Sequence, residues 1–303
     1  MITVSNLTKR FGDFYALNRL NCKIPEGCIY GLVGSNGAGK STLLRLISGI
    51  YRPDGGSVAI DGHSVFDNPD VKNRLVFVPD ELFFLPRSNM KRMAELYANL
   101  YERFSLEKFE RLTRLFSLNP NQNIATFSKG MKRQAATILA LCCNADYILF
   151  DETFDGLDPV MRNLVKTLLY DDVLERKATA VITSHSLREL EDTCDQLALL
   201  HKGGIIFESD IGNLKTSLFK VQVAFSEDYD KTKFDGISVL SYTKHGSVAS
   251  LIVRGDREQT EAKITAMQPI LFEILPLSLE EVFVFEMDAL GYAFSEVLKE
   301  EVK

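Results

Sequence analysis

The sequence predicts an α/β domain followed by a smaller α+β domain, and three features carry that prediction. Apolar strands recur between residues 28 and 200 with helical stretches between them, which is typical of parallel α/β folds. A glycine-rich loop joins one of these strands to a helix. After about residue 212, short strands surround a single polar helical stretch. We therefore expect domains at residues 1–212 and 213–303.

The composition is that of a folded protein with ordinary charge. The 303 residues are 46% hydrophobic and 25% charged, so neither disorder nor a fibrous repeat is favoured. A net charge of -6 and a pI near 5.4 disfavour a nucleic-acid partner. No apolar run approaches the ~18 residues that span a bilayer, and the first ten residues do not resemble a secretory signal. We expect a cytoplasmic protein whose five cysteines are reduced, mostly buried thiols.

The elements follow one another in a regular order. The first 30 residues alternate and then become apolar, and a turn at 24–27 precedes a strand at 28–33. A helix follows the glycine-rich loop, because apolar residues recur at helical spacing from Leu43 to Ile47 and Gly49 provides a stop. The pattern is helical between Asp80 and about Leu141, which predicts a helical insertion. Further strands are expected at 147–150, 179–183, 196–200, 219–225 and 248–253, and a helix at 257–267.

The glycine-rich loop fits the spacing of a phosphate-binding loop. Glycines at these positions let backbone N–H groups converge on phosphate oxygens at a helix N-terminus. Lys40 would neutralise the β- and γ-phosphates of a nucleotide, and Ser41 would ligate Mg²⁺. The alternative is a glycine-rich turn that only caps a helix. The predicted phosphate site consists of Gly34, Ser35, Asn36, Gly37, Ala38, Gly39, Lys40, Ser41 and Thr42.

Two adjacent carboxylates follow the apolar strand at 147–150. Parallel sheets gather their catalytic groups at the carboxyl ends of such strands. Asp151 would hold Mg²⁺ through water, and Glu152 would act as general base on an attacking water. The alternative is that both acids are solvated residues between a strand and a helix cap.

Beyond this point the chain resembles the ABC-type ATPases. Phe127-Ser128-Lys129-Gly130-Met131 resembles the family signature, usually Leu-Ser-Gly-Gly-Gln, with Ser128 and Gly130 as the matching residues. In the family, the signature of one subunit closes on the γ-phosphate held by the other subunit. The Ser-Lys-Gly-Met version is similar to ATPases of bacterial drug and antibiotic exporters. Outside this context the segment would be an ordinary helix cap.

Three further positions are assigned by the same resemblance. Asp158, in Asp155-Gly156-Leu157-Asp158, matches the segment that crosses the dimer interface, where it would stabilise the loop joining the two sites. His185 matches the family's switch histidine, which contacts the γ-phosphate, although a lone histidine after a strand is usually a solvated turn residue. Phe11 lies where the family stacks an aromatic ring on adenine. Phe14 and Tyr15 compete for that role, and Phe11 has the alternative of being core of the first hairpin.

One position departs from the family pattern. Asp80 occupies the place of the glutamine that normally reaches Mg²⁺ and the attacking water. An aspartate still offers oxygen to the metal, but it adds negative charge near Asp151 and Glu152. We count Asp80 as a metal and catalytic candidate. The equal alternative is that Asp80 is the N-cap of the next helix.

Two segments point to the rest of a transporter. The apolar segment Leu82-Phe83-Phe84-Leu85-Pro86 lies where family members grip a helix of the membrane subunit, with burial inside the helical insertion as the alternative. Residues 276–283 resemble a tail that is common in exporter ATPases.

The resemblance implies the architecture and the function together. The expected fold is the ABC ATPase domain of the P-loop NTPases, with a mixed sheet core, an antiparallel β subdomain and a helical insertion at about 80–141. Its expected activity is hydrolysis of ATP with Mg²⁺, coupled to a separate membrane permease of an exporter. The subunit would form a homodimer or a heterodimer with another ABC ATPase on the inner face of the membrane. The alternatives are a soluble ABC ATPase without a transport role and, more weakly, a P-loop kinase or GTPase.

Overall fold

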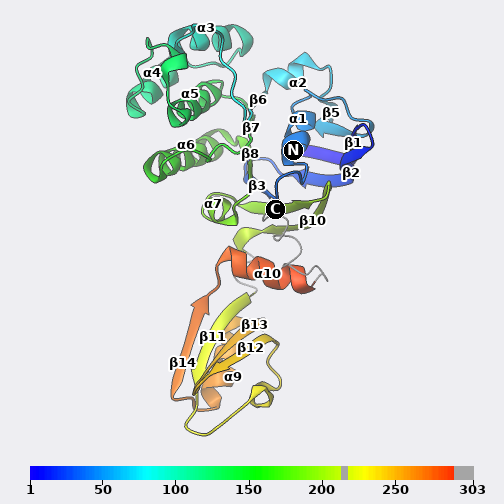
Figure 1. The fold of residues 1–303 in the computed structure, drawn as a ribbon, viewed down its shortest axis with the longest axis vertical. Helices are drawn as coiled ribbons and strands as arrows, with labels where there is room; N and C mark the ends of the chain where they lie inside the picture. The colour runs from blue at the N-terminus through cyan, green and yellow to red at the C-terminus, as the bar shows by residue number, and fades with distance from the viewer. Residues whose placement is uncertain (213–217, 290–303) are drawn as a thin grey trace. The chain divides into compact units, whose positions relative to one another are not determined.

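The computed structural model describes residues 1–212 and 218–289, and its contacts divide the chain into two compact units (Figure 1). The units are Met1–Glu208 and Ser209–Lys303. The ends of the predicted second domain, 213–217 and 290–303, lie outside the described residues.

A six-stranded sheet forms the centre of the first unit. Strand β3 pairs in parallel with β8 and β9, and β7 pairs in parallel with β6 and β8. The last strand, β10, follows β9 after only two residues, so it runs antiparallel and makes the sheet mixed. In order across the sheet the strands are β10 (Gly204–Asp210), β9 (Gln196–His201), β3 (Ile29–Val33), β8 (Thr179–Ser184), β7 (Tyr147–Phe150) and β6 (Leu75–Val78).

An antiparallel sheet packs over helix α1 (Lys40–Ile47). Its central strand β1 pairs with β2 on one side and β4 on the other, so that Ile2 lies between Ile24 and Ile60. Apolar residues from both sheets and from α1 form one buried cluster, which explains why the glycine-rich loop is held between two sheets. The strands are β2 (Phe14–Ile24), β1 (Ile2–Phe11), β4 (Gly55–Ile60) and β5 (His63–Ser64).

Three helices in contact with one another form a helical group, shown at one end of the first unit in Figure 1. Each begins at a capping side chain that accepts a hydrogen bond from a backbone N–H group: Asn89, Ser105 and Ser128. The helices are α3 (Met90–Leu100), α4 (Leu106–Leu115) and α5 (Lys129–Cys142). The short α2 (Pro69–Asn73) precedes them, and α6 (Pro159–Arg176) and α7 (Leu187–Glu191) follow.

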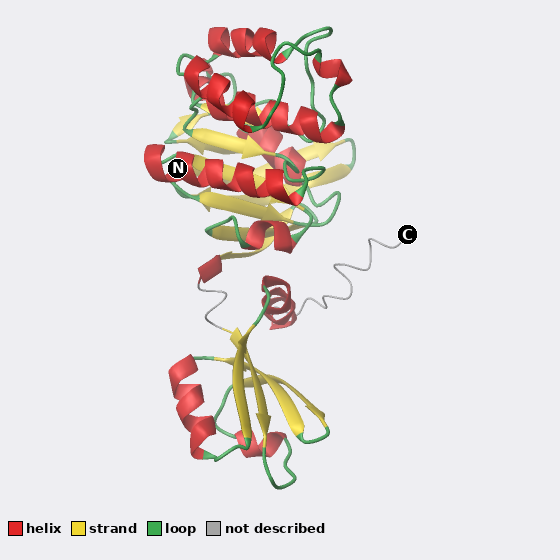
Figure 2. Cartoon of the chain, turned by 90° about the vertical axis from the view of Figure 1, so that its left-hand side faces the viewer, coloured by secondary structure: helices red, strands yellow, loops and turns green. Residues whose placement is uncertain are grey.

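The second unit is a four-stranded antiparallel sheet with a helix against one face (Figure 2). Ile264 of that helix joins a core of strand residues such as Val221 and Leu251. The phenol oxygen of Tyr229 lies 2.8 Å from the carbonyl oxygens of both Val223 and Ser247, so its hydroxyl can donate to either, which ties the loop after β11 to the sheet. The strands, in order, are β12 (Val239–His245), β13 (Val248–Arg254), β11 (Leu218–Ala224) and β14 (Leu271–Pro276), and the helices are α9 (Arg257–Ala266) and α10 (Leu279–Ala289).

The cysteines are confirmed as free, buried thiols. Burial raises the pKa of Cys22 and Cys142 to about 12, so neither forms a nucleophilic thiolate at neutral pH. Within the described ranges, no helix has the length and apolarity needed to cross a bilayer.

Gly56 offers a test of how β4 is seated beside β1. Its φ of 74° is left-handed, and an added Cβ would lie 2.3 Å from the backbone carbonyls of both Ser5 and Asn6. We expect Gly56→Ala to lower the free energy of unfolding by about 3 kcal/mol or more, measured with urea. Gly62→Ala is the control, because Gly62 has a φ of 81° but open space around it, and it should cost only ~1 kcal/mol. Equal losses in the two variants would contradict the close approach.

Candidate active site

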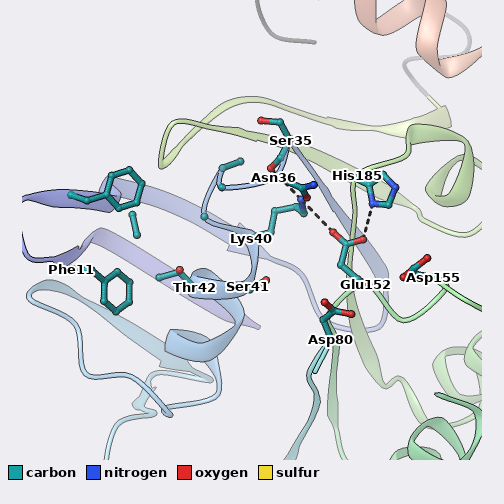
Figure 3. A pocket seen from close by; sticks show the side chains of 15 residues that line it. Phe11, Ser35, Asn36, Lys40, Ser41, Thr42, Asp80, Glu152, Asp155 and His185 are labelled. Atoms are coloured by element: carbon teal, nitrogen blue, oxygen red, sulfur yellow. Dashed lines mark hydrogen bonds and ion pairs between the residues drawn. The ribbon is translucent and has the colours of Figure 1, made fainter. Parts of the chain in front are cut away.

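The glycine-rich loop forms the floor of a cavity of about 410 Å³ (Figure 3). Residues Ser35 to Thr42 of the predicted phosphate site line this cavity, whereas Gly34 is buried behind them. A side chain at Gly34 would meet the carbonyl oxygen of Leu200 at 2.3 Å, so the close approach of β9 requires glycine there. Since α1 begins at Lys40, its N-terminus faces the cavity, an arrangement that favours anions.

Lys40 places a buried ammonium group beside this loop. Its Nζ donates to the carbonyls of Gly34 at 2.6 Å and Ser35 at 3.3 Å. The same Nζ lies 3.4 Å from Oε1 of Glu152. The positive charge is thus held by neutral carbonyls and one carboxylate, next to the position that the loop offers to phosphate groups.

Asp151, at the end of β7, is fully buried and offers an unused oxygen atom. Its Oδ1 accepts hydrogen bonds from Ser41 at 3.1 Å and from Thr183 at 2.7 Å. Its Oδ2 has no hydrogen-bond partner in the described part of the chain. An unpaired buried carboxylate oxygen is costly, and oxygen is the ligand that Mg²⁺ prefers, so Asp151 and Ser41 fit a magnesium site.

Glu152 is held in one orientation from both its backbone and its side chain. Its φ is 50°, a left-handed value that is uncommon outside glycine, and its N–H donates to Thr183 Oγ1 at 3.0 Å. The carboxylate lies between Lys40 and His185, whose Nδ1 is 3.0 Å from Oε2 (Figure 3). This geometry points the Glu152 carboxylate into the cavity, where it can accept a proton.

Thr183 is a residue of the site that the sequence did not reveal. The sequence identified it only as the end of a strand, yet its hydroxyl donates to Asp151 and accepts from the Glu152 amide. Its position follows from the register of β7 against β8, in which Phe150 lies beside Ile182. A strand register of this kind is set by long-range pairing, so the linear sequence carried no signal for it.

Asp80 lines the cavity opposite the phosphate loop, and the interpretation of Asp80 as a helix cap is wrong. Residues 80–89 form a loop, because the next helix begins only at Met90 and Asn89 is its cap. The side chain of Asp80 instead accepts a hydrogen bond from Arg133 of α5 at 2.7 Å. The sequence did not single out Arg133.

The three aromatic residues that competed for the adenine position differ in whether they line the cavity. Phe11 and Phe14 both line the cavity, whereas Tyr15 does not. Phe11 is 46% exposed and makes an edge contact with Tyr51, with ring centroids 5.7 Å apart. The alternative that Phe11 belongs to the hairpin core is therefore wrong, and its ring remains accessible to a planar ligand.

The signature residues lie away from the cavity. Ser128 caps α5, accepting from the amide of Met131 at 3.2 Å, and neither Ser128 nor Gly130 is among the lining residues. A Cβ on Gly130 would meet the carbonyl of Gly156 at 2.9 Å, so the signature packs closely on the next loop. In that loop Asp158 caps α6, accepting from the amides of Val160 and Met161 at 3.0 Å.

Asp155 also lines the cavity, although the sequence did not identify it as a site residue. It forms an ion pair with Lys129, which joins the loop at 155–158 to the start of α5. Lys129 Nζ lies 2.9 Å from Asp155 Oδ2, and this hydrogen bond holds the pKa of Asp155 below its usual value.

A glycine-rich loop before α1, two carboxylates after β7 and a separate helix that begins at Ser128 are the arrangement expected of a nucleotide-hydrolysing α/β cassette. The ABC transporter family profile matches residues 17–155. The chain is 31% identical over 228 residues to the ABC transporter ATP-binding protein NatA of Bacillus subtilis, covering 72% of this chain and 92% of NatA. This protein belongs to the ATP-binding proteins of ABC transporters, and ATP binding and hydrolysis are its activity.

One further relative extends the match beyond the cassette, and others match the cassette itself. The ABC transporter ATP-binding protein YtrB of Bacillus subtilis is 29% identical over 285 residues, 94% of this chain and 97% of YtrB. The daunorubicin/doxorubicin resistance ATP-binding protein DrrA of Streptomyces peucetius is 30% identical, covering 72% of this chain and 67% of DrrA. A solved ATP-binding subunit of an ABC transporter superposes with a TM-score of 0.65 at 25% identity, covering 71% of this chain and 92% of that subunit.

Removing the Thr183 hydroxyl tests its bridging role. Thr183→Val keeps the shape but leaves the Glu152 amide without a partner in the described chain. Asp151 Oδ1 then has the hydroxyl of Ser41 as its one remaining donor among the described residues. We expect it to lower stability by about 1–3 kcal/mol and ATP turnover by roughly tenfold or more. Thr183→Ser, which keeps the hydroxyl, should retain most of both properties. Wild-type turnover in the valine variant would show that the bridge is not needed.

Proposed function

We propose that this protein is the motor subunit of an exporter, in which ATP-driven closure of two ATPase subunits moves a separate membrane permease. The observation that carries the proposal is Glu152, a carboxylate fixed between Lys40 and His185 on the wall of the cavity that the glycine-rich loop lines. A general base beside a cationic phosphate site suits attack of water on a terminal phosphate.

Each site residue then has a defined role. The backbone of the phosphate loop and Lys40 bind the β- and γ-phosphates, Thr42 lines the same site, and Phe11 stacks on the adenine. Glu152 takes the proton from the attacking water. His185 orients Glu152 through its 3.0 Å contact and reaches the γ-phosphate.

Magnesium has a consistent set of oxygen donors. Ser41 and Asp151 would hold the ion, and the unpaired Oδ2 of Asp151 supports this assignment. Asp80, on the opposite wall, would supply a further oxygen to the metal or the water. When bound, Mg²⁺ would offset the negative charge that develops on the phosphate oxygens.

A second ATPase subunit would complete each site. Ser128 and Gly130 lie outside the cavity of their own chain, which supports a head-to-tail pair in which each signature closes on the partner's nucleotide. Asp158 would stabilise the loop between the two sites by capping α6. The partner is a second copy of this chain or a different ABC ATPase.

The permease would bind next to the cavity. Phe83 is 77% exposed in the apolar segment Leu82–Pro86, which argues against burial of the whole segment and supports a partner contact. Export is supported by the names of DrrA and of the bacitracin transport ATP-binding protein BcrA of Bacillus licheniformis, 27% identical over 218 residues, covering 71% of this chain and 71% of BcrA. The protein would then work on the inner face of the membrane.

The mass of Glu152→Gln in solution tests the composite site. Without the base, ATP should stay bound and hold two chains together, so adding Mg-ATP should double the mass seen by light scattering. Wild-type protein, which turns ATP over, is the control and should give at most a transient dimer. A variant that binds ATP and remains monomeric would contradict self-pairing and leave a different ATPase as partner.

Lys40→Ala tests the phosphate site. Loss of the ammonium should weaken ATP binding by about 100-fold, because charge-assisted bonds to phosphate are lost, as calorimetry would show. Lys23→Ala removes the same charge from an exposed site on β2 and should bind ATP normally. Equal affinities for the two variants would contradict the phosphate role of Lys40.

A further inference from the structure

Every acidic side chain that lines the cavity is paired with a cation. This holds for the described ranges, 1–212 and 218–289, in which three acids lie on the cavity wall. The pairs are Glu152 with Lys40 at 3.4 Å, Asp155 with Lys129 at 2.9 Å and Asp80 with Arg133 at 2.7 Å. The three acids on the cavity wall therefore present little uncompensated negative charge, whereas the buried Asp151 accepts hydrogen bonds from the neutral hydroxyls of Ser41 and Thr183.

Two of these cations come from one helix. Lys129 and Arg133 are four residues apart on α5, so they project from the same face, toward Asp155 and Asp80 respectively. Their surroundings differ. Lys129 and Asp155 are 73% and 47% exposed, whereas Arg133 is 2% exposed and its partner Asp80 is 55% exposed. Solvent therefore screens the first pair on both sides and the second pair only at the carboxylate.

The guanidinium group of Arg133 forms hydrogen bonds to the loop after β6 through both of its terminal nitrogens. One terminal nitrogen donates to the carbonyls of Pro79 and Asp80, at 3.3 and 3.1 Å, and the other donates to Asp80 Oδ1. Its Nε is buried without a partner in the described chain. Asp80 forms a salt bridge with this buried charge, and Asp155 interacts with it at longer range. A lysine could not reproduce the three contacts, because it lacks the planar fork.

The same pair joins two parts of the site. Asp80 follows β6, whose Val78 carbonyl accepts the Asp151 amide at 2.9 Å, and Arg133 lies one turn after the signature residues Ser128 and Gly130. The Asp80 carboxylate therefore lies between the acids of β7 and the signature helix.

We propose that Arg133 is a positioning residue of the nucleotide site, which neutralises Asp80 and so allows ATP to enter before a metal ion is bound. The inference rests on the proposed function, because it assumes that the cavity binds the triphosphate. An uncompensated carboxylate several ångströms from the phosphates would repel them, with an effect of about tenfold on affinity at the dielectric of a protein surface.

The test is the affinity for ATP without metal, measured by calorimetry in EDTA at low ionic strength. Arg133→Gln exposes the Asp80 charge and should weaken binding by about tenfold. Asp80→Asn keeps the acceptor for Arg133 but leaves its positive charge unbalanced, so it should tighten binding several-fold. The double variant removes both charges and should return to the wild-type affinity.

Further variants test whether the change in ATP affinity comes from the Asp80–Arg133 pair, from the net charge of the protein or from loss of folded structure. Lys91→Gln removes one positive charge from an exposed site on α3 that does not line the cavity, and because solvent screens that charge it should change the affinity by less than about twofold. Thermal unfolding reports whether each variant is folded. If Arg133→Gln does not fold, the double variant still decides the question. It should bind ATP as wild type does if the pair acts as neutral, and more tightly if the Asp80 charge is not compensated.

The proposal is overturned by unchanged metal-free affinity in Asp80→Asn, by failure of a folded double variant to return to wild type, or by an equal effect of Lys91→Gln and Arg133→Gln. These outcomes are distinct from failure of the proposed function. If wild-type protein does not bind ATP, or binds it equally well after Lys40→Ala, the proposed function fails. If binding depends on Lys40 but not on Asp80 and Arg133, only this inference fails.

Discussion

The arrangement of the site depends on a single hydroxyl group between two parallel strands. The hydroxyl of Thr183 on β8 donates a hydrogen bond to the buried carboxylate of Asp151 after β7. The same hydroxyl accepts a hydrogen bond from the backbone amide of the next residue. That amide belongs to Glu152, whose left-handed backbone would be costly without a fixed acceptor. One side chain thus fixes the ligand candidate Asp151 and the base candidate Glu152 together, and the register of the sheet places it there.

The parts of the fold that sequence could predict are those set by local pattern. The strand before the phosphate loop, the helix after it and the strand at 147–150 each combine an apolar run with a clear start or stop, and the structure has all three. The sequence predicted a helical pattern from Asp80 onward, but α3 begins only at Met90, because hydrophobic periodicity does not reveal the residue at which a helix begins. The cap at Asn89 decides the start of α3, and residues 80–89 remain a loop.

The missed residues share a physical reason. Thr183 and Arg133 act through partners 31 and 53 residues away, and such contacts exist only once the sheet and the helical group have formed. A buried arginine is also rare enough that a charged position on a helix is normally assigned to the surface. Asp80 was recognised as a departure from the family pattern, but its compensating charge could not be seen without the fold.

The sheet of the second unit has two open edges, β12 and β14, among the described strands. Exposed backbone on an edge strand can recruit a strand from another molecule. Here β12 contains a register irregularity between Val239 and Ser241 and carries Lys244, and β14 ends at Pro276, which has no N–H group to donate. These features discourage edge-to-edge aggregation, so the sheet can keep two unpaired edges without recruiting strands from other molecules.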